Sequence, residues 1–246
     1  MDIPLHSASK YQSLHPDQEN SMEEPWINLQ MYSPFELVLF AIGCLMWVVV
    51  YFLYAKHIAK HMMIGMPVFA AASNFGWEFV WGFLRPYTNM GLLFLWGYRV
   101  WFFFDLYIFY GVYRYGAEQL STPALKRYFK PLIIAVAMCW GFLYWFFKAQ
   151  GYDTPIGANS AYIAQILISI FYLLLILRHR KFVWSSAPIS WLRSLGTGFI
   201  SVFMFIHYPE NQLLLLLCVL SAAVDGVYLY VFHRRTTDDH AIATGG

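Results

Sequence analysis

Seven long apolar segments follow one another along the chain, and short polar stretches separate them. They run from about 34 to 55, 63 to 84, 90 to 113, 131 to 147, 158 to 177, 189 to 205 and 212 to 232. A helix needs about 20 apolar residues to cross a bilayer, with about 17 as the lower limit. No segment alternates as a membrane β-barrel would require. The pattern therefore predicts an all-α integral membrane protein with seven transmembrane helices.

The two ends of the chain are polar and lie outside these segments. We expect residues 1–32 to form a polar N-terminal tail, residues 33–235 the membrane domain, and residues 236–246 a C-terminal tail. The last part of the first tail, 25–32, carries several apolar side chains and fits a short interfacial segment. No basic stretch followed by an apolar core opens the chain, so we expect no cleavable signal.

Composition narrows the class of protein further. Hydrophobic residues make up 59% of the chain and charged residues 12%, about half the charge of an ordinary soluble domain. The mean hydropathy is +0.49. These values argue against a soluble enzyme and a disordered chain. The formal net charge of +2 is too small to indicate the excess of basic residues that is typical of a nucleic-acid-binding protein.

Lysine and arginine gather in alternate loops, which predicts the orientation in the membrane. The first, third and fifth loops and the C-terminal tail hold Lys56, Lys60, Arg114, Lys126, Arg127, Lys130, Arg178, Arg180, Lys181, Arg193, Arg234 and Arg235. The other side holds Lys10, Arg85 and Lys148. We therefore expect a cytosolic C-terminus and a lumenal or outside N-terminus. The membrane would be the endoplasmic reticulum in a fungal host or the cell membrane in a bacterial one.

The third and seventh apolar segments share a short similarity. Asp105, Tyr110 and Arg114 can be laid on Asp225, Tyr230 and Arg234 at the same spacing. Two parallel three-helix repeats joined by a linker helix would produce this match, and coincidence explains it equally well.

Four ionisable residues lie inside the apolar segments: Glu78, Arg99, Asp105 and Asp225. A charge at the bilayer centre costs about 2.5–3.5 kcal/mol on insertion scales, so such residues face the interior and mark candidate functional sites. The alternative is a purely structural ion pair between helices. Counting the helical rise puts Glu78 and Arg99 at similar depth on the outer side, which allows them to pair.

The same count puts Asp105 and Asp225 at similar depth on the inner side. We expect them to lie close together and to share a proton, since desolvation disfavours the ionised form. A neutral carboxylic acid in an apolar cavity can act as a Brønsted acid, and aromatic faces there can stabilise cations. Aromatic residues make up 20% of the chain, although most of them will contact lipid or fill the core.

Four short stretches together resemble the small integral-membrane terpene cyclases of meroterpenoid and indole-terpenoid pathways. They are Ser73 to Phe79, with its Asn-x-x-Trp-Glu element, Trp101 to Asp105, Leu195 to Thr197, and Asp225 to Tyr228. The resemblance covers about residues 33–235. It implies a seven-helix enzyme of isomerase or lyase type, which protonates a terminal epoxide or olefin of a prenylated substrate and folds the chain into fused rings.

The resemblance also implies roles for individual residues. Glu78 and Asp225 correspond to the family's essential acids, and Asp105 lies at the position of its third-helix motif. Because Arg99 is expected to keep Glu78 ionised, Asp225 is the expected initiator, with Glu78 about 10 Å away along the membrane normal. Helical spacing and the motif give the substrate-binding candidates Asn74, Trp77, Trp81, Tyr98, Arg99, Trp101, Phe102, Tyr162, Gln165 and Tyr228.

No cofactor or metal is expected. The adjacent aspartates Asp238 and Asp239 lie in the C-terminal tail, and the helices carry no aspartate-rich motif for a Mg²⁺-assisted loss of diphosphate. The expected partners are a lipophilic prenylated molecule and the lipid bilayer. Gln165 or Asn159, or the conjugate bases of the acids, are candidates for ending the reaction.

Two other classes of protein were weighed. A small-solute or proton-coupled transporter with three, one and three helices would use the same acids for binding or proton coupling. A retinal protein would need a lysine in the last helix, and residues 212–232 contain none.

Overall fold

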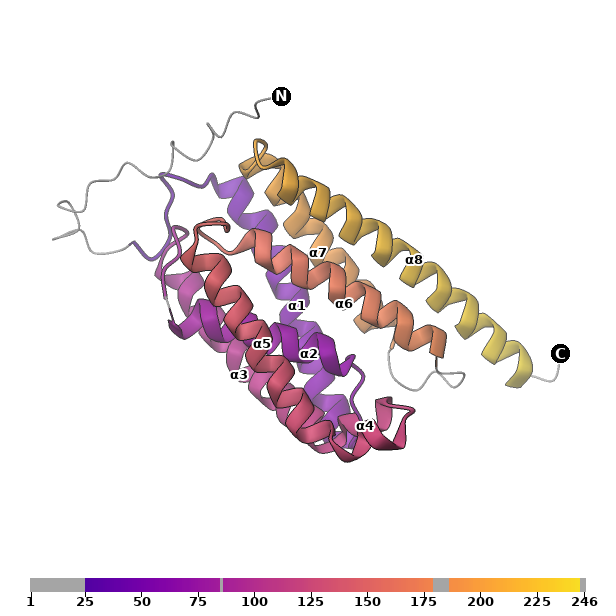
Figure 1. The fold of residues 1–246 in the computed structure, drawn as a ribbon. Coiled ribbons are helices and arrows are strands. Elements are labelled where there is room, and N and C mark those ends of the chain that lie inside the picture. The colour runs from indigo at the N-terminus through magenta and orange to yellow at the C-terminus, as the bar shows by residue number, and fades with distance from the viewer. Residues whose placement is uncertain (1–24, 85, 179–185, 244–246) are drawn as a thin grey trace, which may run out of the picture.

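The computed structural model describes residues 25–84, 86–178 and 186–243, and within these ranges all regular structure is helical (Figure 1). The elements are α1 Pro34–His61, α2 Val68–Phe79, the π-helix η3 Val80–Leu84, α3 Leu92–Tyr115, the 3₁₀-helix η4 Gly116–Gln119, α4 Pro123–Arg127, α5 Phe129–Ala149, α6 Ala158–Arg178, α7 Ala187–His207 and α8 Gln212–Ala243. Six of them, α1, α3 with η4, α5, α6, α7 and α8, are long and apolar enough to cross a membrane.

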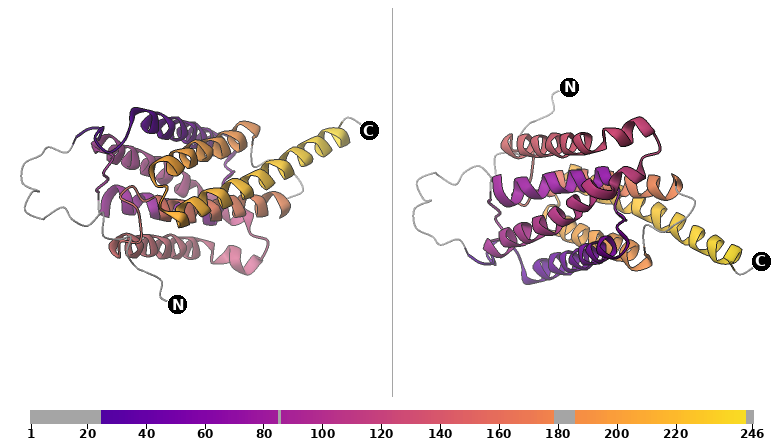
Figure 2. Two further views of the ribbon diagram at one scale, coloured as in Figure 1. Left: turned by 90° about the horizontal axis from the view of Figure 1, so that it is seen from above. Right: turned by 90° about the horizontal axis from the view of Figure 1, so that it is seen from below.

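Six of the predicted segments coincide with these six helices to within a few residues, except at two ends. The helix α1 continues six residues past the predicted end at 55, through the turn that holds Lys56 and Lys60. The last helix continues past residue 235, where we expected the tail to begin, to Ala243. Its C-terminal part projects beyond the other helices in both views of Figure 2.

The second predicted segment is shorter than expected. Helix α2 begins only at Val68, after Pro67, and its 12 residues are followed by five in η3. At about 1.5 Å per residue these elements are shorter than the hydrocarbon core of a typical bilayer. The seven-span count therefore stays a prediction. The expected tail residues 1–24, Arg85 and the loop 179–185 lie outside the described residues.

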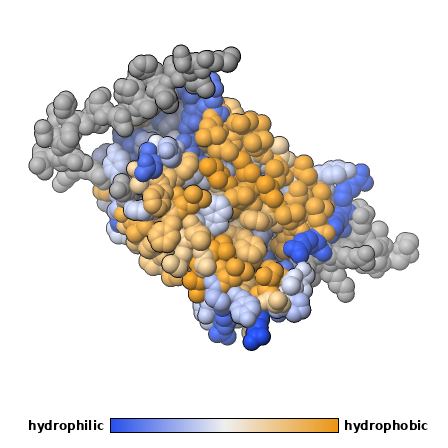
Figure 3. All heavy atoms as spheres, in the orientation of Figure 1, coloured by the Kyte–Doolittle hydropathy of each residue, from blue (hydrophilic) through white to orange (hydrophobic). Residues whose placement is uncertain are grey.

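On the face shown in Figure 3, apolar side chains cover the middle of the bundle, and polar residues lie toward its ends. Leu45, Phe103 and Leu216 are examples of large apolar side chains that are more than half exposed. Such a surface is unfavourable in water and suits the hydrocarbon core of a bilayer. The chain is therefore a multi-pass membrane protein.

Close packing of the helices depends on small residues. The contact of α1 with α7 is formed at Gly43 and Gly196, where a Cβ added to Gly43 would lie 2.7 Å from the Gly196 carbonyl oxygen. At the contact of α2 with α5, a Cβ on Gly76 would lie 2.9 Å from the backbone nitrogen of Gly141. Glycine at both crossings lets the backbones approach as in other membrane helix pairs.

Helix α2 lies at the centre and packs on α3, α5 and α6, while α8 packs on α6 and α7. The run of small residues on α2, from Ala70 to Ser73, is buried against the helices that surround it. Because α2 is surrounded by other helices, polar side chains on it point into protein and not into lipid.

The segment 25–32 is bound to the start of α3. The backbone amides of Leu92 and Leu93 donate to the carbonyl oxygens of Pro25 and Trp26, at 3.1 Å each. Trp26 and Leu29 are exposed, whereas the Tyr32 side chain is buried. Exposed apolar residues beside the membrane-spanning helices fit the interfacial segment that we predicted.

The glycine contact between α1 and α7 gives a test of the packing. We expect Gly43→Ala to lower the free energy of unfolding by about 1–3 kcal/mol, because the new methyl group overlaps the Gly196 carbonyl oxygen and the Ile200 side chain of α7. The measurement is thermal unfolding of the purified protein in detergent.

Gly97→Ala on α3 is the matched control, since a Cβ there meets nothing within 4 Å. It should keep or raise stability, as alanine favours a helix over glycine. Equal melting temperatures for the two variants would contradict the close crossing.

Candidate functional site

A cavity of about 140 Å³ lies between α1, α2, α3, α6 and α7. Seven of the predicted site residues line it: Asn74, Trp77, Glu78, Tyr98, Trp101, Tyr162 and Gln165. An apolar cavity of about 150 Å³ holds a molecule the size of benzene. A longer ligand must therefore displace wall side chains or extend out of the cavity.

An acid cluster borders the cavity where α1, α2 and α3 meet. Asn74 and Glu78 lie one helical turn apart on α2, which puts them on the same face. The Asn74 side-chain nitrogen donates to Asp105 Oδ2 at 3.0 Å and also contacts the Tyr51 hydroxyl. That hydroxyl in turn donates to Glu78 Oε1 at 3.1 Å. Three helices thus bring two carboxyl groups to one amide.

The two carboxyl groups of the acid cluster are buried without a cation. Glu78 is 4% exposed and Asp105 is 1% exposed. Among the described residues neither forms a salt bridge, and the oxygens Glu78 Oε2 and Asp105 Oδ1 have no hydrogen-bond partner. Two negative charges so close together in an apolar site are unfavourable. We therefore expect the cluster to hold a proton that it can donate into the cavity.

A separate ion pair lies where α6, α7 and α8 meet. Arg193 Nη2 is 2.8 Å from Asp225 Oδ1, and both side chains are almost fully buried. The guanidinium carbon lies 4.7 Å from the ring centre of Tyr172 and 4.9 Å from that of Tyr228. Both aromatic faces stabilise the cation. Asp225 therefore has a buried cation beside it, and the two charges can balance each other.

The ion pair reaches the cavity wall through hydrogen bonds. Arg193 Nη1 donates to Ser169 Oγ at 3.0 Å, and Gln165 Nε2 donates to the same oxygen at 3.4 Å. Gln165 lines the cavity, whereas Asp225 does not. Asp225 thus influences the cavity through its neighbours and not by direct contact.

Two pairings expected from the sequence are wrong. Asp105 shares Asn74 with Glu78, and Asp225 pairs with Arg193, so the two aspartates do not form one acid pair. Glu78 is not paired with Arg99, whose Nε donates to the Gly82 carbonyl at 3.2 Å. Two side chains at a similar depth along the membrane normal can still point to different sides of the bundle, so depth alone did not predict which of these charged residues pair.

Arg193 and Tyr51 are the site residues that the sequence analysis missed. Arg193 was counted as a loop charge, yet it lies inside α7 and is fully buried. A signal was present, because Ser190, Arg193, Thr197 and Ser201 recur at helical spacing and form one polar face. Tyr51 carried no such signal among the many aromatic residues of the chain.

Aromatic side chains form much of the cavity wall. The Trp77 ring stands edge-on to Tyr98 at 5.5 Å between ring centres and stacks on Trp81 at 5.8 Å. The Trp47 indole donates to Thr197 Oγ1 at 3.3 Å, and Tyr162 is within 2.8 Å of Ser201 Oγ. These bonds fix the rings, so their faces form a preorganised wall for a cation.

Four predicted binding residues and one candidate base lie away from the cavity or behind its wall. Trp81 lies behind Trp77, Arg99 contacts Trp96, and Tyr228 is hydrogen-bonded to Ser190. Phe102 lines a second, apolar hollow of about 610 Å³ between α2, α3 and α5. Asn159, a candidate base, is bonded to the Tyr152 carbonyl and to Asn211 and does not line the cavity.

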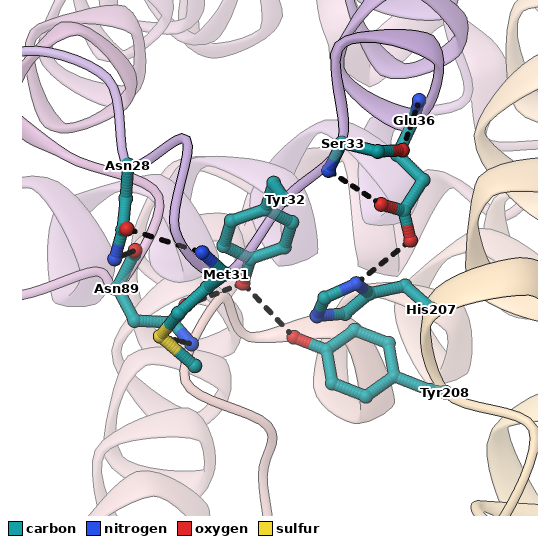
Figure 4. Close-up of polar contacts among 8 residues, drawn as sticks. All are labelled: Asn28, Met31, Tyr32, Ser33, Glu36, Asn89, His207 and Tyr208. Carbon is teal, nitrogen blue, oxygen red and sulfur yellow. Dashed lines mark hydrogen bonds and ion pairs between the residues drawn. The ribbon is translucent and has the colours of Figure 1, made fainter.

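A polar network closes the end of the bundle at which α1 begins (Figure 4). The Tyr32 hydroxyl donates to Asn89 Oδ1 at 2.6 Å, and its ring stacks on His207 at 4.2 Å. His207 Nδ1 lies 2.9 Å from Glu36 Oε1. Burial raises the pKa of Tyr32 to about 12, so the hydroxyl stays a donor. Tyr32 belongs to the same apolar cluster as Phe40 and Met204, which line the cavity.

Comparison with known proteins gives one family. The sequence model of the Pyr4-like transmembrane terpene cyclases matches residues 23–237. The Pyr4-family terpene cyclase mfmH of Annulohypoxylon moriforme is 22% identical over 203 residues, which are 76% of this chain and 81% of that protein. The terpene cyclase ascF of Acremonium egyptiacum is 27% identical over 120 residues, which are 47% of this chain and 40% of that one. No solved structure matches the chain significantly.

The buried ion pair predicts a defined pattern of stability. Asp225→Asn leaves the Arg193 charge buried and uncompensated, so we expect a loss of about 3–5 kcal/mol. Replacing both residues, Arg193→Met with Asp225→Asn, should restore much of that loss. Thermal unfolding in nanodiscs measures both.

Asp105→Asn is the control, because no buried cation depends on Asp105, and its effect should be smaller. A double variant as unstable as Asp225→Asn alone would show that the ion pair is not the cause.

Proposed function

Because the chain belongs to the Pyr4-like transmembrane terpene cyclases, we propose that it protonates a terminal epoxide or olefin of a prenylated, meroterpenoid-type substrate and cyclises it through carbocations. One observation carries this proposal. Glu78, a buried carboxyl group without a cation partner among the described residues, lies in the wall of an aromatic-lined cavity. A proton source that faces aromatic rings suits a reaction through cations.

Glu78 is the initiating acid in this proposal, in place of Asp225. Asp225 already has the Arg193 cation beside it, whereas Glu78 has no cation partner among the described residues and is linked to Asp105 through Asn74. In this proposal the transferable proton therefore lies on the Glu78 and Asp105 cluster. The Glu78 O–H bond breaks as its proton moves to the epoxide oxygen or the olefin carbon. In an epoxide, a lone pair on oxygen takes the proton, and the C–O bond breaks with its electrons moving to that oxygen. In an olefin, the π pair forms the new C–H bond. Either route leaves a tertiary cation on the substrate.

Ring closure follows on the substrate itself. Each remaining double bond attacks the cation, forms a C–C bond and moves the positive charge along the chain. The faces of Trp77, Tyr98 and Trp101 border the space in which this charge moves. Loss of a proton to the Glu78 and Asp105 carboxyl groups, or to water at Gln165, ends the reaction. With proton loss, the product is an isomer of the substrate.

Asp225 has a positioning role. It fixes Arg193, and Arg193 holds Ser169, to which Gln165 of the cavity wall is bonded. Removing Asp225 would free a cation beside the cavity, where it would oppose a cationic intermediate.

The chemistry needs no metal in this proposal, because an acid proton takes the place of a leaving diphosphate. The substrate is lipophilic and reaches the cavity from the bilayer. The transporter alternative is not favoured, since the family match identifies an enzyme family.

The arrangement of the helices supports the proposed repeat. Helix α3 packs on α1 and α2, as α8 packs on α6 and α7. Helix α1 packs on α7, as α2 packs on α6, and α5 connects the two sets. We propose two three-helix units joined by α5, with α2 and η3 as the seventh membrane-crossing segment. Asp105 and Asp225 then occupy equivalent positions.

The proposed initiator is tested by Glu78→Gln, which keeps size and hydrogen bonding but removes the transferable proton. We expect turnover to fall by roughly 10²–10⁴-fold, the usual contribution of a general acid, in a protein that still folds and binds substrate. Microsomes containing the protein are supplied with epoxyprenyl aromatic compounds, and isomers of unchanged mass are measured.

Glu118→Gln is the matched control, because Glu118 is exposed on η4 and pairs only with Lys126 among the described residues. It should leave turnover unchanged. Arg193→Met with Asp225→Asn should retain measurable turnover. Full activity in both Glu78→Gln and the double variant would defeat the acid mechanism. An active Glu78→Gln with an inactive double variant would instead return the initiator role to Asp225.

The orientation is tested separately with tags at the two ends. The C-terminal tag should be accessible from the cytosol, and the N-terminal tag should be protected in sealed microsomes, as the lysine and arginine distribution predicts. A cytosolic N-terminal tag with a C-terminal tag on the opposite side would invert the proposed topology.

A further inference from the structure

The loop between α5 and α6 packs directly on the tryptophan pair of the cavity wall. Gly157 has a φ of +77°, and a Cβ on it would lie 2.5 Å from Trp81 Cε2 and 2.9 Å from Trp77 Cζ2. Only a glycine combines this left-handed backbone with so close an approach. The loop therefore covers the edges of both indoles and fixes their position.

The N–H of Trp77 is bound to this loop region by a chain of hydrogen bonds. Trp77 Nε1 donates to Ser160 Oγ at 2.9 Å. The Ser160 hydroxyl in turn donates to the Asp153 carboxylate in a short hydrogen bond. The Gly157 carbonyl oxygen, at 3.3 Å from Ser160 Oγ, is the other acceptor within reach of this hydroxyl. The Asp153 carboxylate is closer and carries charge, so it is the stronger acceptor of the serine proton. The chain has one direction and ends on a carboxylate.

Asp153 is itself held in place by backbone amides. Its Oδ1 accepts from the backbone nitrogen of Thr154 at 2.9 Å and from that of Asn159 at 2.8 Å. These bonds cap the first turn of α6 and fix the direction of the carboxylate. The carboxylate therefore points at Ser160 whether or not a ligand is bound.

We propose that Asp153 is a positioning residue for the reaction, which acts through Ser160 to hold the Trp77 indole and to increase the electron density of its cavity-facing ring. Successive hydrogen bonds polarise one another, and the carboxylate charge at the end of this chain draws the indole proton toward Ser160. Tryptophan binds cations best among the aromatic side chains. The inference rests on the proposed cyclase function, because it needs a cationic intermediate beside Trp77.

The charge of Asp153 gives the proposal a pH signature. Burial raises the pKa of Asp153 to about 6. Tyr98 on α3 and Tyr144 on α5 interact electrostatically with Asp153. Farther out, Lys148 on α5 lies over the Trp81 ring, and Tyr208 at the end of α7 lies beside Thr154. Tyrosine and lysine ordinarily titrate near pH 10. Between pH 5 and 7, Asp153 is thus the group of this loop that changes charge, and the carboxylate form is present above about pH 6.

A purely structural role for Asp153 in starting α6 is the competing explanation. Thr154 offers a control for it, because Thr154 Oγ1 accepts from the backbone nitrogen of Ala158 at 2.8 Å and so caps the same helix. No hydrogen bond joins Thr154 to Trp77 or Ser160 in the described residues. Thr154→Ala therefore removes a cap without interrupting the chain to the indole.

The test compares Ser160→Ala, Asp153→Asn and Thr154→Ala in the microsomal assay with epoxyprenyl aromatic compounds. We expect Ser160→Ala and Asp153→Asn to lower kcat on the order of 3- to 10-fold with little change in KM, as befits loss of part of a cation–π contribution. Both should release more partly cyclised product. Thr154→Ala should keep the wild-type kcat. Ser160→Ala leaves the backbone hydrogen bonds to Asp153 in place. It therefore tests the chain to the indole even if Asp153→Asn folds poorly.

Two further readouts separate polarisation from packing. In a Trp77→Phe background, Ser160→Ala should have no additional effect on kcat, because phenylalanine has no indole N–H to donate to Ser160. The wild-type kcat should fall as pH drops through about 6, and Asp153→Asn should lack this decline. The same loss of kcat in the Trp77→Phe background, or equal effects of Ser160→Ala and Thr154→Ala, would overturn the proposal. Glu78→Gln separates a failure of the proposed cyclase function from a failure of this inference. If Glu78→Gln is inactive and Ser160→Ala is fully active, the cyclase proposal stands and only the positioning role of Asp153 is refuted.

Discussion

An ionisable side chain inside an apolar bundle must meet an opposite charge or stay neutral, because hydrocarbon offers no water to solvate it. The two halves of this protein meet that constraint in different ways. Asp225 has Arg193 and two tyrosine rings around the guanidinium. Glu78 and Asp105 have a shared amide and, in our interpretation, a proton. The arrangement explains why acids of similar sequence context take different roles.

The helices could be predicted from the sequence because each must be apolar over its whole length to lie in a membrane. The exception, α2, shows the limit of that signal. Residues 63–67 are as apolar as the helix that follows, so hydropathy cannot separate them from it. Pro67 was the available sign of a helix start. Burial by neighbouring helices, and not the length of the segment, determines the place of α2.

The acidic members of the candidate site could be predicted, but their pairing could not. A polar residue in an apolar helix is conspicuous by itself, which is why Glu78, Asp105 and Asp225 were found. Which of them meet depends on how the helices pack, and this is set by small residues such as Gly43 and Gly76 at the crossings. Arg193 was assigned to a loop because it lies near the end of its helix, where a positive charge is ordinary.

The polar network at the end of the bundle where α1 begins joins residues from opposite ends of the sequence. Tyr32 and Glu36 are synthesised early, while their partners His207 and Tyr208 are 171 to 176 positions later in the chain. A ribosome adds about 5–20 residues per second. During translation, the first residues of α1 therefore wait without these partners until α7 has been inserted. Their binding reports that the bundle is nearly complete, because α7 also supplies part of the cavity wall.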